Sequence, residues 1–128
     1  MTTKAYVEHV ALHVRDIHWH IRFFREVLGM TMRLLDGPAE NPRQYWTLGG
    51  LQFVASPDFS GPEGRLAHLG LMCDDVEAAL AAAAGFGVTA MAQGRHWLRL
   101  PDGLVVELLQ AREGAVAQML AIDPRAAP

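Results

Sequence analysis

Two short stretches decide how this chain is organised: VEHVALHV (residues 7–14) and LAHLGL (residues 66–71). Both read as β-strands, and each places a histidine, His9 or His68, at its third position. The second stretch thus repeats the first one half-chain later. An internal repeat of this kind is typical of a duplicated module that does not close a core alone.

Each copy of the repeat continues with a helix and three further strands. In the first copy Asp16 is a candidate N-cap, four apolar residues follow at helical spacing, and Gly29 is placed to end the helix. In the second copy Asp75 stands where Asp16 stands in the first, and Asp74 and Glu77 have the spacing of a capping box. The predicted strands are 7–14, 30–35, 44–48, 51–55, 66–72, 88–91, 95–100 and 104–109, and the predicted helices are 17–28 and 74–84.

These elements predict an α+β fold in which two βαβββ modules form a curved, partly open eight-stranded sheet with helices outside. The stretch SPDFSGPEGR (residues 56–65) is rich in Pro and Gly and is the best internal boundary. The predicted organisation is one structural domain with a first module at 1–57, a linker at 58–65, a second module at 66–110 and a tail with a short helix at 111–128.

Composition excludes several classes of function. The chain has 128 residues, 51% of them hydrophobic and 20% charged, and its net charge of −3 offers no basic surface excess for nucleic acid. Cys73 is the only cysteine, which excludes an intramolecular disulfide and fits a reducing compartment. No apolar run approaches the roughly 18 residues of a membrane span, and the N-terminus has no apolar leader segment. We therefore expect a cytoplasmic protein with no membrane partner.

Alternation along the strands predicts which side chains share a face of the sheet. His9 and His13 lie on the face of the first strand that is turned away from the helix, and His68 lies on the corresponding face of the repeat. Glu107 has the same orientation in the last strand, and Gln52 is in phase on the fourth. We therefore expect His9, His68 and Glu107 to converge on one concave face.

The chemistry of these three side chains favours a metal. Two imidazoles and one carboxylate are the ligand set expected for a first-row divalent ion with open coordination positions. Burying Glu107 unpaired in a strand of Leu and Val would be costly, and a metal ion removes that cost. The alternative is that Glu107 pairs with Arg99 or Arg95 and that the two histidines are ordinary strand residues.

Further residues are candidates for contacts with a substrate. A three-residue turn at 101–103 would place Trp97 beside Glu107 and Arg99 on the same face. Trp97 would then offer a stacking wall and Arg99 an anion clamp. His13, one step along the first strand from His9, is the third candidate.

The stretch VEHVALHVRDIHWHIRFFREVLGM resembles the opening of vicinal oxygen chelate proteins, the superfamily of glyoxalases, fosfomycin-resistance proteins and extradiol dioxygenases. There the first strand carries a metal-binding histidine, followed by an Asp-capped helix, an aromatic pair and Leu-Gly. The stretch LRLPDGLVVEL resembles the closing hairpin of the same proteins, in which a Glu ligand follows Pro-Asp-Gly. The resemblance covers residues 5–110. The matching residues are His9, Asp16, Phe23, Phe24, Leu28, Gly29, Pro101, Asp102, Gly103 and Glu107.

The resemblance implies that His9, His68 and Glu107 bind a divalent metal ion (Ni, Co, Zn, Mn or Fe) and that the fourth ligand position falls near Gln52. Glyoxalase I proteins often have Glu there, whereas methylmalonyl-CoA epimerases have Gln. Gln52 lies two residues after Gly50 rather than four, so a solvated strand glutamine is the alternative. The resemblance also implies a homodimer, with the modules paired within one chain or swapped between two.

Three functions follow as competing hypotheses. The leading one is a metal-dependent glyoxalase-like lyase or isomerase, whose small substrate chelates the ion through neighbouring oxygens while Glu107 moves a proton. Glu40, in the loop before the third strand, is a further candidate base. The second hypothesis is an Fe(II) extradiol-type ring-cleaving dioxygenase, with His13 as its acid–base group. The third is a non-catalytic binding protein of the bleomycin-resistance type, although such proteins lack the three ligands.

Overall fold

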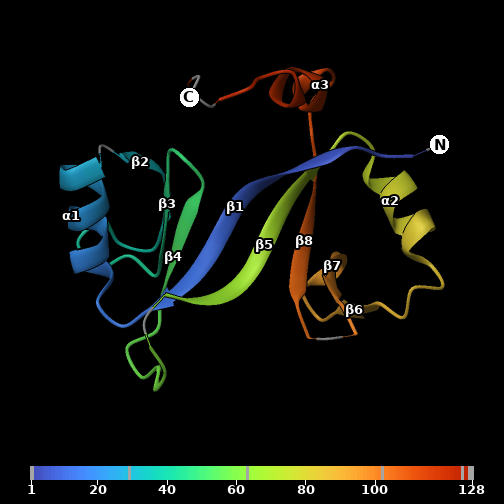
Figure 1. Cartoon of the computed structure of the whole chain (residues 1–128). Helices are drawn as coiled ribbons and strands as arrows, with labels where there is room; N and C mark the ends of the chain where they lie inside the picture. Colours follow the sequence, from blue (N-terminus) through green and yellow to red (C-terminus); the bar gives the residue numbers. More distant parts are fainter. Residues whose placement is uncertain (1, 29, 63, 102, 125, 127–128) are drawn as a thin grey trace. The chain divides into compact units, whose positions relative to one another are not determined.

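Two βαβββ repeats follow each other along the chain, and a short helix completes it (Figure 1). The structure, a computed structural model, describes residues 2–28, 30–62, 64–101, 103–124 and 126. The predicted helix stop at Gly29 and the predicted turn residue Asp102 lie outside the described residues. The first repeat comprises β1 (Ala5–Val14), α1 (Ile17–Leu28), β2 (Met32–Asp36), β3 (Gln44–Thr47) and β4 (Leu51–Ala55). The second comprises β5 (Arg65–Cys73), α2 (Val76–Ala83), β6 (Thr89–Met91), β7 (Gly94–Arg99) and β8 (Val105–Gln110), and α3 (Ala115–Leu120) follows.

The strands form one eight-stranded mixed sheet in the order β2-β3-β4-β1-β5-β8-β7-β6. β1 and β4 pair in parallel, whereas the β3–β4 and β7–β8 hairpins are antiparallel. β2 and β6 are the two end strands, so the sheet is not closed into a barrel. The predicted α+β fold, with two βαβββ modules contributing to an open eight-stranded sheet, is confirmed.

The chain divides into two compact units. One consists of residues 9–69 and is called here the 9–69 unit; the other consists of residues 1–8 and 70–128 and is called the C-terminal unit. The division falls within β1 and β5, so each of these strands contributes residues to both units.

The core of the 9–69 unit lies between α1 and the strands β1, β3 and β4, and Figure 1 shows α1 alongside β3 and β4. Val14, Ile17, Tyr45 and Phe53 are buried there, and Leu12 packs against them. Leu12 and Val14 therefore face the helix, as the alternation of the first strand predicts. Each large apolar side chain buried in this way stabilises the fold by roughly 1.5–3 kcal/mol.

Aspartates begin both long helices. Asp16 precedes α1, and its Oδ1 accepts the N–H of Trp19 at 3.1 Å, as predicted. Before α2 it is Asp75 that takes this place, and its Oδ1 accepts the N–H of Ala78 at 3.0 Å. Such a bond satisfies one of the N–H groups that the start of a helix leaves without an intrahelical partner.

The capping box predicted to begin at Asp74 is wrong. The Asp74 carboxylate turns to the N-terminal segment, where its Oδ1 accepts bonds from the Thr3 hydroxyl at 2.6 Å and the Lys4 N–H at 2.9 Å. The Thr3 hydroxyl, followed by the Lys4 backbone, holds the pKa of Asp74 below its ordinary value. Two adjacent aspartates thus have different partners, and only the second caps the helix.

The C-terminal unit has its own buried core, to which β5, β7, β8, α2 and α3 contribute. Cys73 at the end of β5 is 2% exposed, and burial raises the pKa of its thiol. The short tail helix predicted after residue 111 is present as α3 and buries Val116. The buried apolar residues of this unit are Cys73, Val76, Leu98, Val106, Leu108, Ala111 and Val116.

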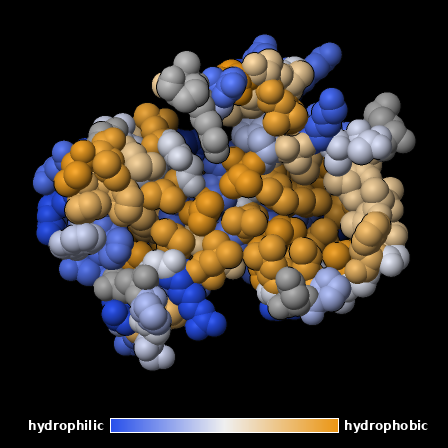
Figure 2. Space-filling view, in the orientation of Figure 1, coloured by the Kyte–Doolittle hydropathy of each residue, from blue (hydrophilic) through white to orange (hydrophobic). Residues whose placement is uncertain are grey.

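Large apolar side chains remain exposed on α1. They are Trp19, Phe23, Val27 and Leu28, and the rings of Trp19 and Phe23 stack with their centroids 5.0 Å apart. Figure 2 shows hydrophobic residues at the surface over this helix. Exposed apolar groups that gather in one place are typical of surfaces that contact another molecule. Among the described residues, no helix has the length and apolar character needed to cross a membrane.

The two aspartates at the start of α2 can be separated by substitution. Asp75→Ala removes the N-cap, and we expect the free energy of unfolding, measured by urea denaturation, to fall by about 1 kcal/mol. Asp75→Asn keeps a side-chain oxygen that caps equally well, so its loss should be less than half as large. Equal losses in the two variants would contradict the capping role.

Candidate metal centre

Two histidines that lie far apart in the sequence meet inside the 9–69 unit. His9 on β1 is 6% exposed and His68 on β5 is 9% exposed. Their Nε2 atoms are 3.0 Å apart, and the rings are nearly perpendicular, at 89°. The expectation that these two side chains converge is met. Both rings cannot carry a proton on Nε2 at this distance, because two donors would then face each other.

The separation between the two nitrogens fits a shared metal ion. Two imidazole nitrogens bound at about 2.1 Å to one ion, at a right angle to each other, are about 3.0 Å apart. The observed 3.0 Å equals this value. The same distance also suits a hydrogen bond between one donor ring and one acceptor ring. The pair is therefore compatible with a metal and is satisfied without one.

Gln52 supplies a second sign of a ligand site. It lies on β4 in register with Ala11 of the parallel strand β1, so it shares the face that carries His9, as predicted. Its side chain is 3% exposed, and its Nε2 donates to Oε1 of Gln44. Among the described residues, Gln52 Oε1 is the buried side-chain oxygen or nitrogen that has no hydrogen-bond partner.

An unpaired buried acceptor is costly, by about 1–3 kcal/mol. The Gln52 side-chain nitrogen donates to Gln44, and this bond orients the amide so that the Gln52 oxygen has no hydrogen-bond partner among the described residues. A cation bound to Gln52 Oε1 would remove the cost. The buried position also argues against the alternative that Gln52 is a solvated strand glutamine.

Gln44 is a residue that sequence reasoning missed. A signal for it exists, because β3 and β4 form a tight hairpin in which Trp46 pairs with Gln52 and Gln44 pairs with Val54. Gln44 therefore stands diagonally across from Gln52 on the same face of the sheet, within reach of a long side chain.

Glu107 belongs to the C-terminal unit, where it is half-buried on β8. The register of the β7–β8 hairpin pairs Trp97 with Glu107 and Arg99 with Val105, as predicted. Trp97 is half-buried and Arg99 is exposed. The strand alternation thus places Trp97, Arg99 and Glu107 on one face of this hairpin.

Arg95 does not pair with Glu107. Its guanidinium forms an ion pair with Glu77 of α2, so this alternative for Glu107 is wrong. The pair is exposed, and the Arg95 hydrogen bond is the main reason why the pKa of Glu77 is lowered. It joins α2 to β7 and does not bear on the candidate site.

His13 has a defined environment in the 9–69 unit. Its Nδ1 lies 2.9 Å from the Ser56 hydroxyl, and its ring stacks on Phe59 with the centroids 5.7 Å apart. These contacts hold the imidazole against the segment that follows β4. Glu40, the other candidate base, is exposed in the loop between β2 and β3. A role of either residue in catalysis remains a prediction.

The arrangement around Gln52 predicts an unusual effect on stability. In metal-free protein, Gln52→Leu removes the unpaired oxygen and keeps an apolar side chain of similar size. We expect the free energy of unfolding in urea with EDTA to stay unchanged or to rise by up to about 2 kcal/mol. Gln44→Leu removes the hydrogen-bond acceptor of the Gln52 side-chain nitrogen. We expect this variant to lower the free energy of unfolding by about 1–2 kcal/mol. In a Gln44→Leu background, where the hydrogen bond from Gln52 to Gln44 is already lost, a further loss above about 1 kcal/mol for Gln52→Leu would show that the Gln52 oxygen is already satisfied.

Comparisons with known proteins show the family and the fold of the chain. Residues 9–117 match the model of the glyoxalase-like domain family. A methylmalonyl-CoA epimerase from Streptomyces coelicolor, solved as a single-residue variant in complex with 2-nitronate-propionyl-CoA, aligns with a TM-score of 0.59 at 18% identity, over 84% of this chain and 95% of its own. The epimerase from Mycobacterium tuberculosis aligns with a TM-score of 0.58 at 17% identity, over 91% of both chains.

A third solved structure of similar fold has a different activity. The 2,3-dioxygenase LapB from Pseudomonas sp. KL28 aligns with a TM-score of 0.58 at 21% identity, over 82% of this chain and 42% of its own. No curated protein matches the chain. At these identities the structural likeness establishes the fold alone. The family match spans most of the sequence, and the chain belongs to the glyoxalase-like domain family of the vicinal oxygen chelate superfamily.

Proposed function

We propose that this protein is a metal-dependent lyase or isomerase of the glyoxalase type. The observation that carries the proposal is a set of buried donors on one face of the 9–69 unit: the paired His9 and His68 nitrogens and the unpaired oxygen of Gln52. A core selected for stability alone would place apolar side chains at these positions.

We propose that a divalent ion is held by His9, His68 and Glu107, each of which offers one ligand atom. Gln52 is proposed as the fourth ligand, with Gln44 keeping its oxygen free of a competing hydrogen bond. When bound, the ion supplies Lewis-acid stabilisation of the negative charge that develops on a substrate oxygen. The donor set of two imidazoles and oxygen ligands suits Ni, Co, Zn, Mn or Fe.

The proposed catalytic group is Glu107. A carboxylate has two oxygens, so one is free to accept a proton from the substrate carbon next to a carbonyl while the other serves as a ligand. In an isomerase the same carboxylate returns the proton. Among the described residues, Glu107 is the carboxylate that groups with His9 and His68 as a possible set of metal ligands.

The number of proposed ligands favours proton transfer over ring cleavage. Three protein ligands leave three positions on a six-coordinate ion, which a dioxygenase needs for a chelating catechol and for oxygen. A fourth protein ligand, Gln52, leaves two positions, which suits a substrate bound through two neighbouring oxygens. LapB shares the fold, so ring cleavage stays the second candidate. A non-catalytic binding protein would not need the buried polar side chains of His9, His68 and Gln52.

The substrate class follows from the same chemistry. Two neighbouring oxygens and an acidic C–H bond occur together in α-oxo hemithioacetals and in acyl thioesters that carry a second carboxyl group. Methylmalonyl-CoA epimerases solved with methylmalonyl-CoA and with 2-nitronate-propionyl-CoA share the fold. We propose a small substrate of this kind, contacted by His13, Trp97 and Arg99, with the exposed Arg99 guanidinium placed for an anionic group.

We also propose that the protein acts as a cytoplasmic homodimer. The exposed stretch of α1 that includes Trp19 and Phe23 offers apolar area that a second chain would cover. The molecular mass in solution would show whether the protein is a dimer. Cross-linking of mixed chains would show whether the modules pair within one chain or by swapping between two.

Proton exchange tests the proposed reaction without knowledge of the final product. Metal-loaded protein is incubated in D2O with methylmalonyl-CoA and, separately, with a methylglyoxal–thiol hemithioacetal. We expect deuterium to enter next to the carbonyl of one of these compounds, and NMR measures its incorporation. Glu107→Gln should lower the rate at least about 100-fold, because the base is lost. Glu113→Gln, a change of the same kind on an exposed tail residue, serves as the control.

Two outcomes would overturn the proposal. Proton exchange by Glu107→Gln at the same rate as by Glu113→Gln would remove the catalytic role of Glu107. Alternatively, Fe(II)-loaded protein that cleaves a catechol with uptake of oxygen, while no exchange occurs with either thioester or hemithioacetal, would establish the dioxygenase activity instead.

A further inference from the structure

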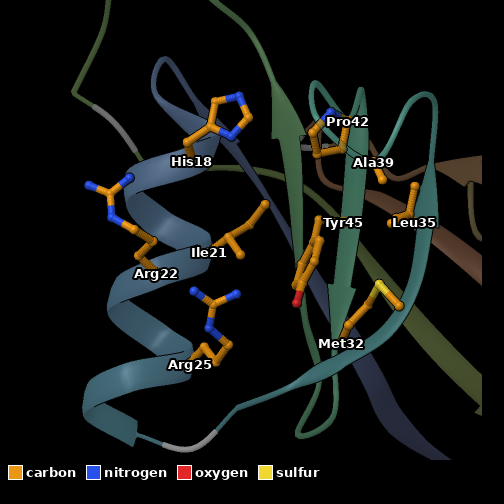
Figure 3. A pocket seen from close by; sticks show the side chains of 9 residues that line it. All are labelled: His18, Ile21, Arg22, Arg25, Met32, Leu35, Ala39, Pro42 and Tyr45. Carbon is orange, nitrogen blue, oxygen red and sulfur yellow. The ribbon is translucent and has the colours of Figure 1, made fainter.

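A separate cavity lies in the 9–69 unit between α1 and the strands β2 and β3. Its volume is about 520 Å³, within the range of cavities that hold small organic molecules. Tyr45 on β3 points into it, whereas the neighbouring Gln44 contacts Gln52 on the opposite face of the strand. The cavity is therefore distinct from the proposed metal centre. Its lining residues are His18, Ile21, Arg22, Arg25, Met32, Leu35, Ala39, Pro42 and Tyr45 (Figure 3).

The cavity is lined by apolar residues and by basic residues that all come from one helix, α1. His18, Arg22 and Arg25 follow one another along α1 at spacings of four and three residues, and no acidic residue lines the cavity. Among the described residues, no carboxylate lies within ion-pair distance of His18 or Arg22. The chain as a whole carries a net charge of −3, so this concentration of basic groups is local.

The basic groups are not equivalent. Figure 3 shows the Arg25 guanidinium turned toward the phenol oxygen of Tyr45, whereas the Arg22 guanidinium points away from the strands. Burial raises the pKa of Tyr45, and the nearby charge of Arg25 opposes this effect. The ion pair of Arg25 with Glu26 is exposed and long, at 3.5 Å, so it holds the guanidinium weakly.

We propose that this cavity binds a small organic carboxylate with an aromatic or branched aliphatic body. The carboxylate accepts hydrogen bonds from the Arg25 guanidinium and the Tyr45 hydroxyl, and the body lies on Ile21, Met32 and Leu35. The hydrogen bonds between the carboxylate and the guanidinium would orient the ligand, while contacts with the apolar lining residues would supply most of the affinity. The proposal does not depend on the metal centre or on the proposed reaction.

Phenylacetate is a suitable probe, and phenylacetamide is its neutral counterpart of the same shape. Binding is measured by NMR titration of isotope-labelled protein in EDTA, so that no metal ion competes for the carboxylate. We expect a Kd of roughly 1–10 mM for phenylacetate, with shifts confined to residues around the cavity. Phenylacetamide should bind at least about five-fold more weakly.

Two arginine variants form a matched pair for this test. Arg25→Gln should weaken phenylacetate binding roughly ten-fold, whereas Arg22→Gln, which removes the same charge from the same helix, should change it less than about two-fold. Tyr45→Phe, which deletes only the hydroxyl, should weaken it about three-fold. Thermal unfolding of each variant checks that α1 remains folded.

Three results would overturn the proposal. Absence of binding by phenylacetate up to about 20 mM would remove the site. Equal affinity for phenylacetamide would show that the cavity does not select a negative charge. Equal weakening by Arg25→Gln and Arg22→Gln, in variants that remain folded, would show a general effect of charge and no seat for a carboxylate.

Discussion

The candidate site is organised around one contact, the approach of two buried imidazoles. His9 and His68 come from the matching strands of two repeats, and their Nε2 atoms lie 3.0 Å apart inside the 9–69 unit. This approach requires the correct orientation of both β1 and β5, because a shift of one residue in either strand would turn its histidine to the helix side. The duplicated fold is thus organised so that equivalent positions of two repeats become neighbours.

The two faces of the sheet in the 9–69 unit differ in what they bury: one buries apolar side chains and the other buries polar ones. Toward α1, Val14 and Phe53 are fully buried and supply stability through apolar packing. On the other face, Gln52 is buried at a cost, because its side-chain oxygen has no hydrogen-bond partner among the described residues. Violations of ordinary burial preference are expected at functional sites and are compensated elsewhere in the fold. The helix-side core is where this compensation lies.

Much of this arrangement could be predicted from the sequence, because strand alternation is a local rule. It placed His9 and His68 together, brought Gln52 into phase and gave the Trp97–Glu107 register. For the cap before α2 the sequence carries two indications, since the repeat matches Asp75 to Asp16 and the capping-box spacing favours Asp74, and the structure has Asp75. The choice depends on Thr3, a residue remote in sequence. Amide contacts such as Gln44–Gln52 likewise depend on side-chain reach, which alternation does not describe.

If the buried donors hold a metal ion, elemental analysis of the purified protein will find it. We expect close to one divalent ion per chain in the wild type after reconstitution. We also expect loss of the ion in His68→Ala and in Glu107→Ala, and weaker retention of the ion in Gln52→Leu. A wild-type protein that remains metal-free after reconstitution with Ni, Co, Zn, Mn or Fe would show that these residues do not form a metal site. The imidazole pair would then be explained by its hydrogen bond alone.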